Sequence, residues 1–187
     1  ATRTNKDGNL ESIAAGLPRI NYENGCGSWL LEDESTNLIV DSVDVDGYFT
    51  AQIDATVTSN YGASPTGENN STRIQWLDST AFIYKAENTV TDTSVSIYVK
   101  GTSGETVMFG LGANVTTGNI YTFDGQWQRI AFTGSTGAQI FLSSYGGATA
   151  TDFEAFGLQL EQNSYATSYI PTNGTAVTRP KDVVGNS

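Results

Sequence analysis

Apolar and polar residues alternate with a period of two over many short stretches of the chain, which is the pattern of β-strands with one buried face. In the stretch TSVSIYVKG, the alternation puts Val95, Ile97 and Val99 on one face and mostly polar residues on the other. ETVMFGLG, QWQRIAFTGS, AQIFLSSY and DFEAFGLQLEQ follow the same rule. These five stretches predict the longer strands of the fold.

The stretch DFEAFGLQLEQ groups Phe156 with Leu158 and Leu160 on its buried face. Shorter strands are predicted in SWLLE, TNLIV, GYFTAQIDATV, TRIQWL and AFIYKA. No segment keeps a helical period for three turns, and turn clusters such as GTSGE and YGGATA separate the strands. About ten short strands joined by turns predict an all-β fold, which we expect to be an antiparallel β-sandwich of the jelly-roll type.

The length of 187 residues predicts a single domain, spanning residues 1–187. Residues 1–27 and 162–187 are rich in Pro, Gly, Asn and Thr and poor in alternation, so we expect extended terminal segments around a core of residues 28–161. The ends echo each other as ATRTNKDG and VTRPKDVVG. A repeated module junction and coincidence in a Thr-rich chain both explain this echo. The first residue is not Met, and we expect a piece of a longer protein.

Charge and composition remove several function classes. Nine Lys and Arg stand against twenty Asp and Glu, for a net charge of −11, so neither nucleic acid nor an anionic membrane surface is an expected partner. No apolar run approaches the roughly 20 residues that span a bilayer, and we expect no membrane insertion. The chain has no His, which removes the commonest general base and zinc ligand, and Cys26 is expected to be a free thiol. We expect no enzymatic activity.

Glu32, Asp33 and Glu34, which follow a predicted strand, are candidates for catalysis by paired carboxylates. Glycoside hydrolysis needs two carboxyl groups about 5–10 Å apart across a cleft, whereas consecutive acids at a strand end are typical of a solvated turn. A polysaccharide lyase would use a base such as Tyr98 with Arg129 neutralising the uronate, but nothing in the sequence selects these two residues. A depolymerase stays a remote alternative.

A structural calcium ion is the one cofactor for which the sequence offers ligands. Asp41, Asp44 and Asp46 precede Gly47, and oxygen ligands on a tight glycine turn suit calcium. A second stretch, NKDGNLE, places Asn, Asp and Glu at alternate positions. Neither stretch follows the full twelve-residue calcium loop, and acidic turns are common in a chain of this charge.

Aromatic residues are numerous for so polar a chain, with three Trp, nine Tyr and eight Phe. Sugar rings stack on exposed aromatic faces, and Arg, Asn, Gln and Asp bind their hydroxyl groups. The positions opposite the apolar rows supply that mixture. The candidate ligand-binding residues are Tyr98, Arg129, Gln139, Tyr84, Gln75 and Arg73, with Lys100 beside Tyr98. Trp29, Trp76 and Trp127 are predicted to be core residues, because aromatic side chains dominate cores.

The two ends carry a resemblance to a known module. The segment TRTNKDGNLESIAAGLPRINYENGCGSWLLEDESTNLI and the closing LQLEQNSYATSYIPTNGTAVTRPKD are similar to the start and end of a module found widely in tailed-phage structural proteins. Between them, TSVSIYVKG, WQRIAFTG and FEAFGLQLE resemble three strands of carbohydrate-binding-module jelly rolls. The resemblance implies an extracellular tail-fibre, head-fibre or other virion-surface component with a lectin-like sandwich. It identifies no ligand residues.

Two functions remain after these exclusions. The first is non-catalytic carbohydrate binding, with a polysaccharide or cell-surface glycan as the partner. The second is a purely structural virion decoration or fibre spacer, whose extended ends contact other virion proteins or further copies of the chain, for example in a trimer.

Overall fold

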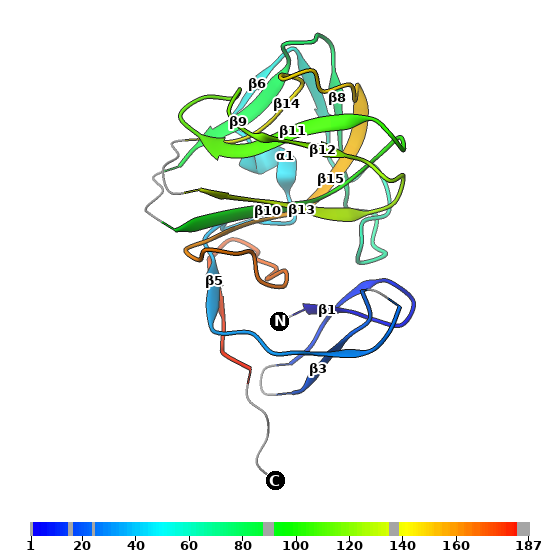
Figure 1. Cartoon of the computed structure of the whole chain (residues 1–187), viewed down its shortest axis with the longest axis vertical. Coiled ribbons are helices and arrows are strands. Elements are labelled where there is room, and N and C mark those ends of the chain that lie inside the picture. The colour runs from blue at the N-terminus through cyan, green and yellow to red at the C-terminus, as the bar shows by residue number, and fades with distance from the viewer. Residues whose placement is uncertain (1, 15–16, 24, 88–91, 135–138, 183–187) are drawn as a thin grey trace.

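A computed structural model of the chain describes residues 2–14, 17–23, 25–87, 92–134 and 139–182. Two five-stranded antiparallel sheets lie one above the other (Figure 1), which confirms the predicted all-β sandwich. The lower sheet has the strand order β13 (Gln128–Gly134), β10 (Thr93–Gly101), β15 (Asp152–Glu161), β8 (Thr72–Trp76) and β7 (Ala55–Thr58). The upper sheet has the order β12 (Asn119–Thr122), β11 (Thr106–Gly112), β14 (Gln139–Ser143), β9 (Phe82–Ala86) and β6 (Ala51–Ile53).

The main core lies between the two sheets. Val95, Ile97 and Val99 of β10 are completely buried there, as their alternation predicts, and Val107 and Phe109 of β11 face them from the upper sheet. The stretch GYFTAQIDATV was predicted as strand throughout, but its start belongs to a short helix, α1 (Val45–Tyr48). The Asp44 carboxylate caps this helix by accepting a hydrogen bond from the Gly47 N–H, at 3.0 Å.

The helix α1 lies between the sheets (Figure 1). Its Val45 and Tyr48 side chains are both buried in the main core, which the strand prediction did not foresee. Within the described residues, no helix is long and apolar enough to cross a membrane.

A bulge in β15 reverses which side chains face the core. Ser96 of β10 is opposite Gln159, but Tyr98 is opposite Phe156, so β15 has one residue more than β10 over this interval. Gly157 sits at the irregularity with φ +68°, a conformation that favours glycine. Phe156 therefore leaves the main core, where Leu158 and Leu160 remain, and the prediction that these three share a face was wrong.

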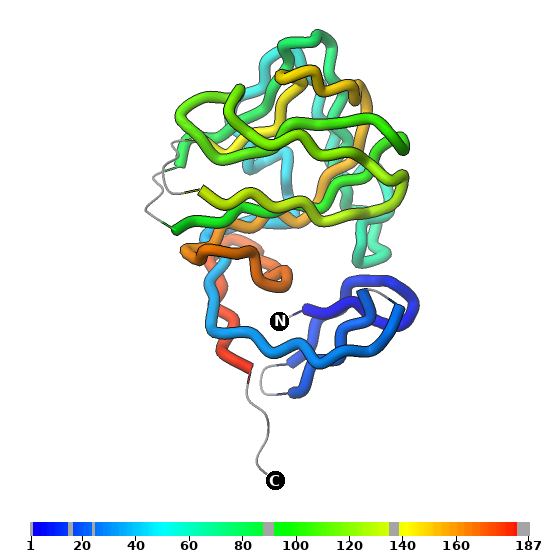
Figure 2. Tube along the Cα trace, viewed as in Figure 1, coloured from blue at the N-terminus to red at the C-terminus, as the bar shows by residue number. Residues whose placement is uncertain are grey.

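Phe156 belongs to a second apolar cluster on the outer face of the lower sheet. Leu10, Phe156 and Tyr169 are buried in it, and Val43, Tyr98 and Trp127 pack against them. Figure 2 shows why this face is covered, because the segment 162–172 runs beneath the lower sheet. Terminal segments thus bury an outer face that alternation alone assigns to solvent.

The described residues between 2 and 34 form a lobe below the sandwich (Figure 1), which we call the N-terminal lobe. It consists of two antiparallel pairs, β1 (Thr2–Thr4) with β2 (Leu10–Ser12) and β3 (Arg19–Asn21) with β4 (Ser28–Leu30). A third pair, β5 (Ser35–Asn37) with β16 (Val177–Arg179), brings the end of the chain back to this lobe. The sheets themselves occupy residues 51–161, and the last residues of VTRPKDVVG lie outside the described residues.

The three Trp residues have different environments. Trp76 is in the main core, as predicted. Trp127 is only partly buried; it packs against the second cluster and donates from Nε1 to the Ala63 carbonyl oxygen at 3.0 Å. Trp29 is 65% exposed, so its assignment to the core was wrong. The reason is that β4 pairs only with β3, and nothing in the described chain covers the face that carries Trp29.

Candidate functional site

The strand order divides the six candidate ligand residues between opposite faces of the sandwich. Tyr98 and Arg129 are neighbours across β10 and β13 on the outer face of the lower sheet, and Arg73 and Gln75 follow on β8 of the same sheet. Tyr84 and Gln139 lie on the outer face of the upper sheet. The six residues therefore cannot form one site.

Three aromatic side chains form a row on the upper face. The ring centroids of Phe82 and Tyr84 are 5.8 Å apart, and those of Phe82 and Tyr145 are 6.2 Å apart. Their planes are tilted by 41° and 37°, so the row twists from one ring to the next. All three side chains are half-buried and keep part of their surface in contact with solvent. We call Phe82, Tyr84 and Tyr145 the aromatic row.

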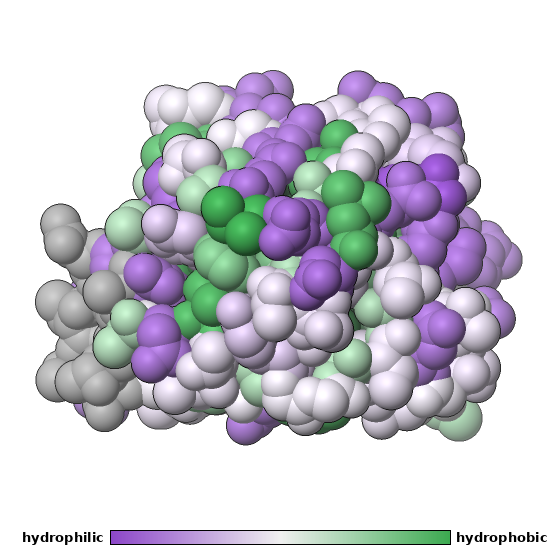
Figure 3. Space-filling model, turned by 90° about the horizontal axis from the view of Figure 1, so that it is seen from above, coloured by the Kyte–Doolittle hydropathy of each residue, from purple (hydrophilic) through white to green (hydrophobic). Residues whose placement is uncertain are grey.

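The outer face of the upper sheet carries no charge at any strand position. Its outward positions are Ala51, Ile53, Phe82, Tyr84, Ala86, Thr106, Met108, Gly110, Gly112, Ile120, Thr122, Gln139, Phe141 and Ser143. None of the fourteen is Asp, Glu, Lys or Arg, although the chain has a net charge of −11. Figure 3 shows this face, with apolar patches beside polar ones. The outer face of the lower sheet differs, because it carries Arg73, Lys100, Arg129, Asp152 and Glu154.

Part of the upper face is closed by a loop. The Ser143 hydroxyl donates to the Val115 carbonyl oxygen at 2.9 Å, and both Ser143 and Phe141 are completely buried. Ile53, which is opposite Phe82 on the edge strand β6, is 46% exposed. The face is therefore open over β9 and β6, where the aromatic row begins, and also at the opposite edge strand β12, where Ile120 is 43% exposed.

The lower face holds a pair of side chains that the sequence had grouped. The Arg129 guanidinium lies over the Tyr98 ring, 5.6 Å from its centroid. It donates from Nη1 to the Thr167 carbonyl oxygen at 2.5 Å and from Nη2 to the Ser96 hydroxyl at 2.8 Å. Its Nε is buried and has no hydrogen-bond partner among the described residues. Tyr98 and Arg129 thus form one unit, and the second N–H groups of Nη1 and Nη2 remain for further hydrogen bonds.

This pair lines a cleft of about 280 Å³ between the lower sheet and the N-terminal lobe. The lobe contributes Asn21 and Glu23, and the segment after β15 contributes Ser168. Burial raises the pKa of Tyr98, and the nearby Glu23 adds to this, while Arg129 only partly opposes it.

Arg73 and Gln75 are engaged with an acid on the neighbouring strand. Arg73 Nε donates to the Asp152 carboxylate at 2.9 Å, and Gln75 Nε2 contacts the same carboxylate at 3.3 Å. The Arg73 guanidinium also lies 4.8 Å from the centroid of the Tyr61 ring. These contacts satisfy Arg73, which leaves it less free than Arg129 to bind a ligand.

The LQLE motif (residues 158–161) holds the segment that lines one side of the cleft. Gln159 is completely buried; its Nε2 donates to the carbonyl oxygens of Thr167 and Ser168, and its Oε1 accepts from the Ile170 N–H at 2.6 Å. Glu161 is also completely buried and accepts from the Ser35 hydroxyl at 2.6 Å and the Thr167 N–H at 2.9 Å. The motif therefore fixes the segment whose Thr167 carbonyl orients Arg129.

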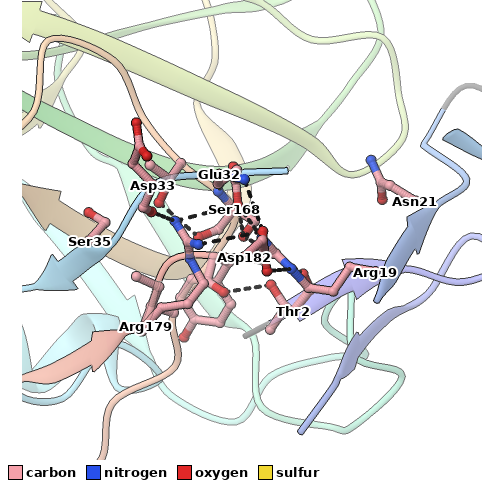
Figure 4. Close-up of polar contacts among 12 residues, drawn as sticks. Thr2, Arg19, Asn21, Glu32, Asp33, Ser35, Ser168, Arg179 and Asp182 are labelled. Carbon is pink, nitrogen blue, oxygen red and sulfur yellow. Dashed lines mark hydrogen bonds and ion pairs between the residues drawn. The ribbon is translucent and has the colours of Figure 1, made fainter. Parts of the chain in front are cut away.

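A buried ion cluster fastens the two ends together (Figure 4). Arg19 and Arg179 are 1% exposed as side chains, and Glu32 and Asp182 lie between them. Glu32 was expected in a solvated turn with Asp33 and Glu34, but its side chain is only 13% exposed, because both arginines and Ser168 converge on it. We call Arg19, Glu32, Arg179 and Asp182 the clasp.

The carboxylates of the clasp are held in their charged form. Burial acts to raise the pKa of Glu32, but hydrogen bonds from Ser168 and Arg19 outweigh it and leave the pKa below its ordinary value. Burial also acts to raise the pKa of Asp182, but the hydrogen bond from Arg19 and further contacts lower it by more, so the pKa lies below its ordinary value. These groups carry structure rather than catalysis, since each faces an arginine.

The three aspartates of the calcium prediction do not form one group. Asp44 caps α1, and Asp46 accepts hydrogen bonds from Gln52 at 3.1 Å and from Ser59 at 2.9 Å. Among the described residues, no three His, Cys, Asp or Glu side chains are placed to hold a metal ion. Cys26 is exposed and free.

Sequence reasoning missed several residues of these surfaces. Phe82 precedes Tyr84 by two positions, so the alternation in AFIYKA does place both on one face. Tyr145 follows the end of β14, where no period applies, and only the folded chain brings it beside Phe82. Asn21 and Glu23 reach the cleft through the N-terminal lobe, whose position the sequence does not indicate.

Comparisons with known proteins add little to this geometry. No protein-family model matches the chain, and no curated protein matches it in sequence. A solved structure described as "BiXyn10A CBM1 APO" is similar over 70% of this chain and 97% of its own, at 14% identity and a TM-score of 0.39. A likeness this low carries no argument about function.

Proposed function

We propose that this protein binds neutral polysaccharide without cleaving it, through the aromatic row on the upper face. The observation that carries the proposal is a row of three half-exposed rings on a sheet face whose outward strand positions are all uncharged. Apolar faces of sugar rings stack on aromatic rings. Because this surface carries no charged side chains, a neutral sugar can cover it without removing charged groups from water.

Gln139 supplies hydrogen-bonding groups on the same face. It is opposite Ala86, while Tyr84 is opposite Phe141, so Gln139 is a diagonal neighbour of Tyr84. An amide both donates and accepts, which suits sugar hydroxyl groups. Contacts of this kind are individually weak, and binding by several copies presented together would raise the overall affinity without new contacts.

The test is affinity electrophoresis in gels that contain neutral polysaccharides such as glucans, mannans or galactans. We expect the wild-type protein to be retarded by at least one of them, and Tyr84→Ala and Phe82→Ala to lose most of the retardation. Tyr165→Ala is the matched control, since Tyr165 is 51% exposed but lies outside the aromatic row.

Two results would overturn the proposal. One is no retardation by any neutral polysaccharide even when the protein is presented multivalently on beads. The other is a Tyr84→Ala variant that is retarded as strongly as Tyr165→Ala. An assay for new reducing ends on the same polymers tests the depolymerase alternative, and we expect none.

A structural role is the second candidate, and a separate observation favours it. The N-terminal lobe exposes Trp29 by 65% and Leu31 by 58%, two alternate positions of the β4 region. An apolar surface of this kind suits contact with another chain. We infer a virion-surface role from the sequence resemblance of the two ends alone; the apolar patch supports only contact with another chain, either a virion protein or a further copy in a homo-oligomer such as a trimer.

Light scattering separates the two candidates. We expect Trp29→Lys to abolish any self-association of the wild-type protein while leaving retardation by polysaccharide unchanged. If Trp29→Lys changes neither the mass in solution nor the capture of partner virion proteins, the structural candidate fails.

A further inference from the structure

Arg129 is a guanidinium in the cleft that has no carboxylate partner among the described residues. Seven of the nine Lys and Arg residues of the chain form ion pairs within the described structure, and Arg129 and Lys6 are the two that do not. Lys6 is exposed on the lobe, whereas Arg129 is partly buried on the sheet. In a chain with twenty acids, a partly buried arginine without one requires an explanation.

The hydrogen bonds of Arg129 leave part of its capacity unused. A guanidinium carries five N–H donors. The structure gives Nη1 and Nη2 one partner each, both of them uncharged oxygens, so each of these nitrogens keeps a second N–H for a ligand; Nε is buried and lies out of a ligand's reach. Arginine binds carboxylates through two parallel hydrogen bonds, so an anion is the ligand chemistry that its free donors favour.

Besides Arg129, the cleft is lined by three charged side chains, and two of them form ion pairs with residues of opposite charge. Arg3 pairs with Glu11 at 2.6 Å, and Glu32 pairs with Arg19 at 2.8 Å. Glu23 is exposed, forms no ion pair within the described structure, and accepts only a 3.3 Å hydrogen bond from Asn21. Among the described residues, the cleft is therefore lined by one unpaired cation, Arg129, and one unpaired carboxylate, Glu23; Asn21 and Ser168 add neutral polar side chains to the lining.

We propose that this cleft binds an acidic sugar residue. Its carboxylate accepts hydrogen bonds from Arg129, and its hydroxyl groups donate hydrogen bonds to Glu23. A simple anion would gain from Arg129 but be repelled by Glu23, whereas a uronate satisfies both because its hydroxyl groups are donors. The volume of about 280 Å³ lies near the lower end of small-molecule sites, which suits a single sugar residue rather than a length of chain.

This site is separate from the aromatic row, because the cleft lies on the lower face and the row on the upper face. The inference does not rest on the proposed function, and either can fail alone. Tyr84→Ala is expected to leave uronate binding unchanged, and cleft variants are expected to leave retardation by neutral polysaccharide unchanged.

The test substitutes Ala131, which lies two residues after Arg129 on β13. Ala131 lines the cleft and is exposed, so a larger side chain there does not disturb the core. Ala131→Glu supplies Arg129 with the carboxylate it lacks, and Ala131→Gln is nearly the same shape without the charge. Calorimetric titration at fixed ionic strength would compare glucuronate and galacturonate with glucose, galactose and acetate.

We expect the wild-type protein and Ala131→Gln to bind at least one uronate at least tenfold more tightly than its neutral counterpart, as a charge-assisted hydrogen bond implies. Ala131→Glu and Arg129→Gln are expected to erase that difference, and Arg73→Gln, an arginine of the same sheet outside the cleft, to keep it. The proposal is overturned if uronate and neutral sugar bind alike, if Ala131→Glu behaves as Ala131→Gln, or if acetate binds as tightly as the uronate.

Discussion

Arg19 and Asp182 are 163 residues apart in the sequence and form an ion pair in which the Arg19 side chain is 1% exposed. The pair joins β3 of the N-terminal lobe to the segment that follows β16. Asp182 also accepts a hydrogen bond from the Glu32 N–H at 2.9 Å, so one carboxylate satisfies donors from two elements. The stability of the lobe therefore depends on a residue near the other end of the chain.

Removal of this carboxylate should be costly. Asp182→Ala leaves Arg19 and Arg179 with Glu32 as their remaining acid, so we expect the free energy of unfolding to fall by about 3 kcal/mol, the lower end for a broken buried ion pair. Urea denaturation followed by tryptophan fluorescence measures it. Asp33→Ala is the control, because the Asp33–Lys181 pair has side chains 70% and 68% exposed. Equal effects of the two variants would contradict the assignment of the clasp.

The clasp also predicts a pH dependence of stability. Glu32 and Asp182 have lowered pKa values in the folded protein, so their stabilising contribution is complete above the unfolded-state values of about 4 and is lost as the pH falls through the folded values. We expect the melting temperature to fall steeply below about pH 4. Thermal melts between neutral and acidic pH measure this.

The double variant Glu32→Gln/Asp182→Asn is the reference for that dependence. It lacks both titrating groups, so it should be less stable than the wild-type protein at neutral pH and should lose less stability on acidification. The two curves should converge at acidic pH. Parallel curves would show that other carboxylates determine the acid sensitivity.

Gly157 should tolerate no side chain. It has φ +68°, and a Cβ there would lie 3.2 Å from Tyr98 Cδ2 and 3.3 Å from Tyr169 Cε2. Gly174 has φ +80° with nothing within 4 Å of the same position, so it shares the backbone conformation without the crowding. We expect Gly174→Ala to cost about 1 kcal/mol and Gly157→Ala clearly more, both measured by chemical denaturation. Similar losses would mean that Tyr98 and Tyr169 move aside freely.

Gln159 should be essential for the segment beneath the lower sheet. Gln159→Leu keeps a similar volume but leaves the carbonyl oxygens of Thr167 and Ser168 and the Ile170 N–H without this partner. We expect a loss of about 3 kcal/mol, measured in urea, since an unsatisfied buried polar group costs about 1–3 kcal/mol. The exposed Gln162, changed to Leu, serves as the control. A stable Gln159→Leu variant would show that the segment holds its shape without the motif.

Alternation predicted the sandwich well because most strands obey it over their full length. Val95, Ile97 and Val99 are buried as expected, since β10 has no extra residue and keeps an unbroken register with β13. The pattern fails at Phe156, because one extra residue in β15 moves the side chain to the other face without changing the local composition. A bulge is a property of the strand pair, and the sequence of one strand does not contain it.

The candidate site was harder to predict than the fold. Outward positions can be read from each strand, but their grouping depends on strand order, which places Arg129 beside Tyr98 and puts Gln139 on the opposite face. Trp29, which was predicted to be buried, is exposed, and Glu32, which was predicted to be solvated, is largely buried. Both differences have a related reason. Whether a terminal strand is covered depends on where the terminal segments lie, and short-range patterns do not specify that.

The first and last described segments, β1 and the residues that follow β16, lie below the lower sheet, while the upper sheet with the aromatic row is on the far side (Figure 1). The clasp makes this arrangement firm, because it ties the start and the end of the described chain to each other rather than to opposite poles of the sandwich. A partner joined covalently at either terminal segment would therefore lie on the side of the lower sheet. The uncharged face of the upper sheet would then point away from that partner. Such an arrangement would present the same surface whichever end served as the attachment.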